Sequence, residues 1–189
     1  MIRILLRALN GPILILILAF GIALQSAVFH LWPLRYFQPD LVLIAVLWCA
    51  LRRGFDEGGI VTLILANIAE VHSSVPQGIF LISYVSIYLL MRASSRLIII
   101  PSVISFAIIA SLASILWKIA VFFVLYLLGT PLSLGKFSIT SFFLGALIEG
   151  VFAFVLYGWL ERFDWITFKS IKAEQALEEE LQYKYEEGI

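Results

Sequence analysis

The chain has 189 residues, of which 62% are apolar and 14% are charged, and its mean hydropathy is +1.02. A soluble domain is about 45–50% apolar and about 25% charged, so this composition excludes an ordinary soluble fold and indicates a membrane protein. At roughly 20 residues per transmembrane helix, the length allows about six spans and no folded domain outside the membrane. Cys49 is the single cysteine, which excludes a disulfide framework and a cysteine-ligated zinc site within one chain.

The first apolar segment covers residues 11–32 and follows Arg3 and Arg7. A basic start followed by an apolar run is also the pattern of a signal peptide. This run is longer than the roughly 7–15 residues of a signal-peptide core, so we favour an uncleaved first span over a cleaved leader.

The second segment is apolar over residues 41–51 and begins directly after Pro39 and Asp40. Proline at the first helical position loses no needed donor, and an early aspartate complements the helix dipole, so the pair predicts a helix start. The segment stops at the sequence Arg52-Arg53-Gly54.

Four more apolar segments follow, at residues 58–71, 78–91, 102–128 and 138–160. Segments two to four have only 11 to 14 residues each. As helices they would be about 16–21 Å long, shorter than the roughly 30 Å hydrocarbon core, so re-entrant hairpins compete with full spans here.

The placement of basic residues favours six spans. If the N-terminus is cytoplasmic, only Arg35 and Lys136 lie in outside segments, and ten basic residues lie in inside segments: Arg3, Arg7, Arg52, Arg53, Arg92, Arg96, Arg162, Lys169, Lys172 and Lys184. This asymmetry follows the positive-inside rule. We therefore predict an all-α integral membrane protein with a six-helix transmembrane domain at residues 1–163, both termini cytoplasmic, and an acidic amphipathic tail at residues 164–189.

Two ionisable residues stand deep within the predicted spans five and six. Lys118 lies ten residues before Leu128, and Glu149 lies 11 residues after Ser138. Both are therefore about 15–16 Å below the outer ends of their helices. Stripes of small residues precede each charge: Ala110 and Ser114 before Lys118, and Ser141 and Gly145 before Glu149.

Because small residues let helices approach closely, the stripes predict that Lys118 and Glu149 form an ion pair inside the bundle. The pair could fix the helix register, which is the interpretation we favour, or it could belong to a proton or ion relay.

A third acid, Glu70, lies near the outer end of span three, with Asn67 on the same helical face. Glu70 could form part of a polar mouth for a ligand, or it could be solvated at the interface or paired with Arg35. His30 and His72 also fall on the outer side, where interfacial positions are the more ordinary explanation than metal ligation.

No catalytic pattern is present. The sequence contains no nucleophile elbow, no phosphate-binding glycine loop and no metal-ligand spacing. We therefore expect no enzymatic activity, no cofactor, no metal and no nucleic-acid partner. In the tail, Leu177, Leu181 and Tyr185 form a narrow apolar stripe that could dock on a partner, although a solvated helix is the simpler interpretation.

Three features between residues 38 and 96 occur together: Pro39-Asp40-Leu41-Val42-Leu43 at a helix start, Leu51-Arg52-Arg53-Gly54 at its end, and Glu70 followed by Ser73, Pro76 and Gly78. In this order and spacing they resemble the MreD family of rod-shape-determining membrane proteins. The resemblance implies a noncatalytic component of the bacterial elongation machinery in the cytoplasmic membrane. It also implies similarity to the six-helix substrate-binding subunits of energy-coupling-factor transporters, an analogy of fold that does not transfer function.

Two functions follow from the sequence. The first, which the resemblance implies, is a scaffold that binds MreC, and through it MreB, RodA and a class B penicillin-binding protein, and so helps to position peptidoglycan synthases. The second is a small-molecule binding or transport subunit with an outward pocket near Asn67, Glu70 and His72. The few polar residues near that mouth favour the scaffold. A homodimer is also open.

Overall fold

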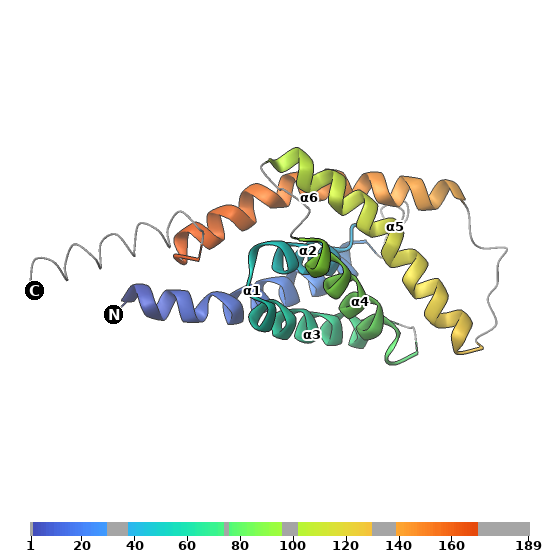
Figure 1. Cartoon of the computed structure of the whole chain (residues 1–189), viewed down its shortest axis with the longest axis horizontal. Coiled ribbons are helices and arrows are strands. Elements are labelled where there is room, and N and C mark those ends of the chain that lie inside the picture. The colour runs from blue at the N-terminus through green and yellow to red at the C-terminus, as the bar shows by residue number, and fades with distance from the viewer. Residues whose placement is uncertain (1, 30–37, 74–75, 96–101, 130–138, 170–189) are drawn as a thin grey trace, which may run out of the picture.

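The computed structural model describes residues 2–29, 38–73, 76–95, 102–129 and 139–169. Over these residues the chain forms six helices: α1 (Ile2–Val28), α2 (Leu41–Arg52), α3 (Phe55–Val71), α4 (Ile79–Ser94), α5 (Val103–Leu127) and α6 (Ile139–Ile166) (Figure 1). The predicted all-α class is confirmed. Within the described ranges, three helices, α1, α5 and α6, are long and apolar enough to cross a membrane, which makes the chain a membrane protein.

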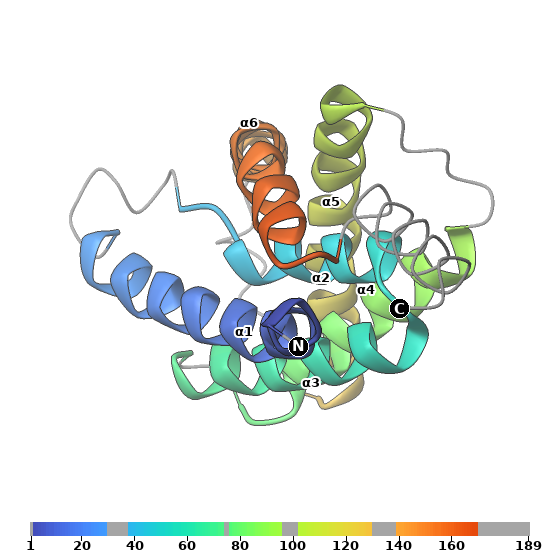
Figure 2. The same cartoon turned by 90° about the vertical axis from the view of Figure 1, so that its left-hand side faces the viewer.

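Helix α2 is the centre of the bundle. It packs against α1, α3, α4 and α5, and nine consecutive residues from Val42 to Ala50 are buried. A helix that is apolar on every face must be covered by lipid or by neighbouring helices, and neighbouring helices cover α2. Figure 2 shows α2 between the pair α5 and α6 on one side and the pair α1 and α3 on the other. Trp48 packs edge-on against Phe106 of α5 and Tyr157 of α6, which joins these layers.

Helices α5 and α6 run in opposite directions and make the most extensive contact of the bundle (Figure 1). Small residues allow this approach, as the sequence predicted. Ala110 and Ser114 are buried in the contact, and a methyl group on Gly150 would overlap the hydroxyl of Ser111 and lie 3.2 Å from the carbonyl oxygen of Ala107. The side chain of Ser141, part of the predicted stripe, lies outside the described residues.

Several helix ends differ from the sequence-based expectation: α3 begins at Phe55 rather than at residue 58, and α4 ends at Ser94 rather than at residue 91. Helix α1 begins at Ile2 rather than at residue 11, because arginine has a high helix propensity and does not prevent a helix from starting early. Pro39 is not the first helical residue: Asp40 is the N-cap of α2, and Pro39 precedes it. Helix α6 continues to Ile166, beyond residue 160 where the predicted apolar segment ends, and Asp164 near its end binds Trp48 and Arg53.

Candidate functional site

A polar cavity of about 400 Å³ lies where α1, α2 and α3 meet α4, α5 and α6. We call it the polar cavity. Its polar and charged lining residues are Gln25, Ser26, Gln38, Asp40, His72, Ser73, Tyr84, Ser114, Trp117, Lys118 and Glu149. They come from six helices or helix ends, so the cavity exists only once the whole bundle has assembled.

Asp40 joins three helices at this cavity. Its Oδ1 accepts a hydrogen bond from the backbone N–H of Leu43 at 2.9 Å, which caps α2. Its Oδ2 accepts one from the hydroxyl of Tyr84 on α4 at 2.6 Å. Its own backbone N–H donates to Oε2 of Glu149 on α6 at 2.9 Å. One residue that the sequence marked as a helix start therefore also connects α2 to α4 and α6.

Lys118 and Glu149 line the same cavity, from α5 and α6, as their predicted depths required. Coulombic attraction acts between them, and Asp40 attracts Lys118 as well. The amino group of Lys118 lies against Gly145, where a methyl group would overlap it. The described hydrogen bond of Glu149 goes to Asp40, so the ion pair with Lys118 stays a prediction, and Asp40 is a partner that sequence reasoning missed.

Two buried polar atoms at this cavity have no hydrogen-bond partner in the structure. They are Oε1 of Glu149, whose residue is only 2% exposed, and Nε1 of Trp117. Leaving such a group unsatisfied costs about 1–3 kcal/mol. Native proteins rarely retain one without a reason, and a bound molecule or a functional need is the usual explanation. Two residues that line the polar cavity, Glu149 and Trp117, therefore each carry one buried polar atom without a partner.

The residues predicted around Glu70 form a helix cap instead of a ligand mouth. The carboxylate of Glu70 accepts hydrogen bonds from the backbone N–H groups of Gly78 and Leu81, at the start of α4. Gly78 has a φ of 95°, a left-handed conformation that favours glycine. Pro76 lies exposed in the same turn. Arg35, the alternative partner of Glu70, lies outside the described residues.

Asn67 also departs from the predicted mouth. Its side chain is exposed and donates to the carbonyl oxygen of Leu63 on its own helix, at 3.2 Å. Of the three residues proposed for an outward pocket, only His72 lines the polar cavity. His30 lies outside the described residues.

A second polar group, which we call the Asp164 cluster, lies at the other end of α6 and consists of Asn10, Trp48, Arg53, Asp164 and Thr167. Asp164 accepts hydrogen bonds from Trp48 Nε1 at 2.8 Å, from the guanidinium of Arg53 at 2.9 Å and from the amide of Asn10 at 3.1 Å. The amide of Asn10 also contacts the hydroxyl of Thr167 at 2.5 Å. The cluster therefore joins α1, α2 and α6 through buried side chains.

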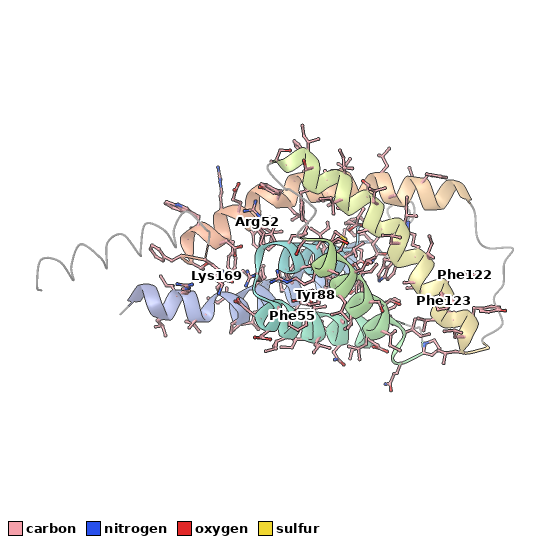
Figure 3. All side chains as sticks on the ribbon, in the orientation of Figure 1. Arg52, Phe55, Tyr88, Phe122, Phe123 and Lys169 are labelled. Carbon is pink, nitrogen blue, oxygen red and sulfur yellow. The ribbon has the colours of Figure 1, made fainter. Side chains whose placement is uncertain are left out.

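Ion pairs extend the Asp164 cluster to α3. Arg53 pairs with Glu57 at 2.9 Å as well as with Asp164, and Lys169 pairs with Glu57 at 2.6 Å. Arg52 points the other way, donating to the hydroxyl of Tyr157 at 2.7 Å (Figure 3). The two arginines that the sequence assigned to a cytoplasmic turn thus hold helices together. Gly54 is the N-cap of α3, with a φ of −60° that any residue can adopt.

Sequence reasoning missed Asn10, Tyr84, Trp117 and the role of Asp164. Asp164 was counted with the acids of the tail, yet it stands between Phe163 and Trp165 in a run that stays mostly apolar. That position was the available signal for a buried acid. Nothing local marks the others, because their partners lie on distant helices. The tail stripe of Leu177, Leu181 and Tyr185 lies outside the described residues.

The comparisons with known proteins add no further identification. No family model matches the chain, no curated protein is significantly similar to it, and no solved structure matches its fold. Within the part of the chain that the structure describes, no group of three or more His, Cys, Asp or Glu side chains is arranged to hold a metal ion.

Proposed function

We propose that this chain is a noncatalytic scaffold of the bacterial cell-elongation complex, of the kind that its resemblance to the MreD family implies. It would bind MreC in the cytoplasmic membrane and, through MreC, connect to MreB, RodA and a class B penicillin-binding protein. The proposal includes six membrane spans, cytoplasmic termini and a fold like that of energy-coupling-factor substrate-binding subunits.

The observation that carries this proposal is how the resemblance residues are used. Asp40 caps α2, Arg53 binds Asp164, and the carboxylate of Glu70 binds backbone N–H groups at the start of α4. These side chains bind other helices of the bundle, so they maintain the protein's own structure instead of performing a reaction. A shape-maintaining role is what a scaffold requires.

A continuous apolar face on α5 gives such a scaffold a surface for a partner helix. Its members recur every three or four residues and are all exposed: Ile104, Ile108, Leu112, Leu116, Ile119 and Phe123. Within an 18-residue apolar stretch of each helix, 17% is buried in α5 and 39% in α6. Figure 3 shows Phe122 and Phe123 on the part of α5 that extends beyond α4. A transmembrane helix of MreC is the partner that we assign to this face.

Co-purification with MreC tests the proposal. The tagged chain, extracted in mild detergent, is expected to retain MreC, and depletion of the chain in a rod-shaped host is expected to give rounded cells. Leu112→Trp on the α5 face should reduce MreC recovery, while the matched change Leu16→Trp on the exposed side of α1 should not. Normal rods and no MreC recovery would overturn the scaffold.

Cysteine labelling tests the six-span topology separately. In a Cys49→Ala background, an impermeant reagent added from outside should label Gly129→Cys, after α5, and should not label Ser95→Cys, after α4. Labelling of Ser95→Cys alone would overturn the orientation with a cytoplasmic N-terminus.

The polar cavity favours a second candidate, a small-molecule binding or transport subunit. Glu149 Oε1 and Trp117 Nε1 are a free acceptor and a free donor of the kind that a ligand satisfies. Loss of uptake of one vitamin on deletion, with cell shape unchanged, would favour this candidate over the scaffold.

A further inference from the structure

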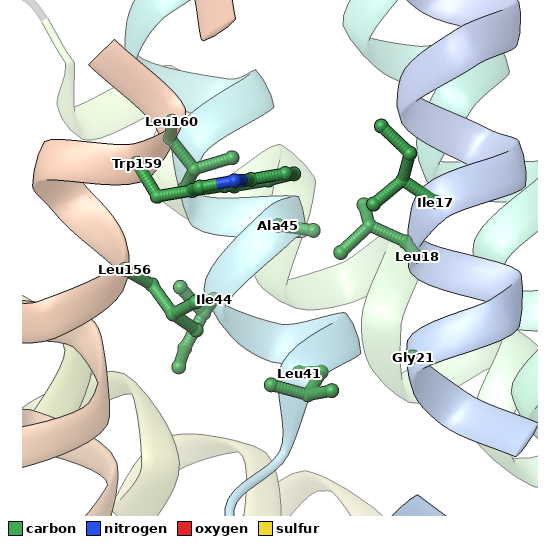
Figure 4. Close-up of a pocket in the computed structure, with 9 residues that line it drawn as sticks. All are labelled: Ile17, Leu18, Gly21, Leu41, Ile44, Ala45, Leu156, Trp159 and Leu160. Atoms are coloured by element: carbon green, nitrogen blue, oxygen red, sulfur yellow. The ribbon is translucent and has the colours of Figure 1, made fainter. Parts of the chain in front are cut away.

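An apolar groove lies between α1 and α6, with α2 as its floor (Figure 4). Its volume is about 220 Å³. Ile17 and Leu18 of α1 face Leu156 and Trp159 of α6 across Ala45 of α2, as Figure 4 shows. No charged side chain lines it. Apart from the indole N–H of Trp159 its lining is apolar, so the groove suits a hydrocarbon chain.

The apolar groove and the polar cavity are lined by neighbouring residues of the same helices. On α1, Gly21 lines the groove and the next residue, Ile22, lines the cavity. On α2, Leu41 lines the groove and its neighbour Asp40 lines the cavity. On α6, Glu149 and Leu156 are seven residues apart, or about 10 Å along the axis. The lining therefore changes from apolar to charged within about two helical turns.

The polar cavity lies at the level where four helices end or begin. Gln25 is in the last turn of α1, Asp40 caps the start of α2, His72 follows the end of α3, and Phe80 is in the first turn of α4. The cavity lies about 15 Å below the outer ends of α5 and α6, and the groove extends from it toward the end of α6. A headgroup reaches this level where the short helices thin the bilayer locally. A lipid of the same leaflet has its headgroup and chain in this order.

We propose that the polar cavity and the apolar groove together bind one phospholipid with an ethanolamine headgroup. Its phosphate accepts hydrogen bonds from Trp117 Nε1 and Lys118 Nζ, its ammonium donates to Glu149 Oε1, and one acyl chain lies in the groove. This lipid site goes beyond the scaffold function and does not depend on it.

The charges of the polar cavity select this headgroup. Two acidic residues, Asp40 and Glu149, and one basic residue, Lys118, line the cavity, so an anionic headgroup meets more acidic than basic groups there. Both oxygens of Asp40 already accept hydrogen bonds, from Leu43 and Tyr84, so Glu149 Oε1 is the acceptor that remains. A choline headgroup has the same phosphate, but its nitrogen carries no hydrogen that could be donated to Glu149 Oε1.

Lipid titration of the delipidated full chain tests the headgroup. Native mass spectrometry would compare phosphatidylethanolamine, phosphatidylcholine and phosphatidylglycerol with identical acyl chains. We expect phosphatidylethanolamine to bind about 3–10-fold more tightly than phosphatidylcholine, the factor that one hydrogen bond of about 0.5–1.5 kcal/mol supplies. Equal binding of all three lipids, or a preference for either of the others, would overturn the proposal.

Trp117→Phe separates lipid binding from structure. The ring of Trp117 stacks on Tyr84 and packs against Phe80, and phenylalanine keeps an aromatic ring there while removing the N–H and part of the indole. We expect the variant to bind phosphatidylethanolamine about 3–10-fold less tightly. Its melting temperature without lipid should change little, because removal of an unpaired buried donor offsets the packing lost with the smaller ring. Unchanged lipid affinity would contradict the assignment.

A second pair of variants tests the groove and stays informative if Trp117→Phe folds poorly. Gly21→Phe places a ring in the apolar groove, whereas Gly158→Phe places the same ring on the open, exposed side of α6, where nothing lies within 4 Å. We expect Gly21→Phe to abolish retention of the co-purified lipid and Gly158→Phe to leave it unchanged. Equal retention in both variants would overturn the groove as the acyl site, whether or not MreC co-purifies.

Discussion

Helix α6 buries two carboxylates, about 22 Å apart along its axis, in opposite circumstances. Asp164 is 5% exposed and accepts hydrogen bonds from Trp48, Arg53 and Asn10. Glu149 is 2% exposed, receives one described hydrogen bond from Asp40, and keeps one oxygen free. The two carboxylates are similarly buried, but Asp164 has hydrogen-bond partners for both oxygens and Glu149 for only one.

The difference distinguishes a carboxylate that fixes the helix arrangement from one that is left to bind another group. A buried acid with three donors is stable only in one arrangement of the helices that supply them, so Asp164 fixes the bundle. A buried acid with a free oxygen destabilises the protein unless something binds it. The unsatisfied oxygen of Glu149 is therefore the feature on which the proposed lipid site rests.

The largest expected effect comes from Asp164→Ala. The guanidinium of Arg53, whose residue is 4% exposed, would then keep only Glu57 as an acidic partner inside the bundle. Removing one partner of a buried pair costs about 3–5 kcal/mol, so the variant should melt far below the parent chain in detergent. Glu161→Ala, which removes an exposed acid from the same helix, is the control and should melt like the parent. Similar melting of both variants would contradict a holding role for Asp164.

The next effect concerns Lys118 and Glu149. Neutralising one of two paired charges leaves the other stranded, so Lys118→Met and Glu149→Gln should each lower the melting temperature, and the double variant should recover part of the loss. We expect a coupling of about 0.5–3 kcal/mol in a double-mutant cycle based on denaturant unfolding. Strictly additive effects would contradict the ion pair. A stable double variant that fails to support rod shape would assign the charges a function beyond structure.

The sequence predicted the helices well because their signals are local. Apolar runs placed all six segments, and Asp40 marked the start of α2 because an N-cap acts on residues three positions away. The equal depth of Lys118 and Glu149 followed from counting residues along two adjacent antiparallel helices. Each of these inferences needs only neighbouring residues and one short connection.

The sequence did not predict the contacts that join distant elements. Asn10 and Asp164 meet across 154 residues, and Asp40 and Glu149 across 109. No local pattern encodes such a pairing, because the partners come together only when the crossing of the helices is fixed. Glu70 shows the same limit at shorter range: it was expected to face solvent, Arg35 or a ligand, and it caps the start of a helix eight residues later.

The smallest expected effect concerns two glycines, one in each of two motifs that carry the family resemblance. Gly54 and Gly78 are both N-caps, of α3 and α4, but only Gly78 is left-handed, with a φ of 95° against −60° at Gly54. Gly78→Ser should destabilise the chain by about 1–2 kcal/mol, the cost of a side chain in that conformation.

The same substitution at Gly54 should have the opposite sign. Serine fits its extended backbone, nothing lies within 4 Å of the added side chain, and its hydroxyl can accept a hydrogen bond at the start of α3. Gly54→Ser should therefore stabilise by about 0.4–1 kcal/mol, partly by restricting the unfolded chain. Denaturant unfolding of both variants measures the difference. If Gly54→Ser instead destabilises as much as Gly78→Ser, the open, extended N-cap geometry assigned to Gly54 is wrong.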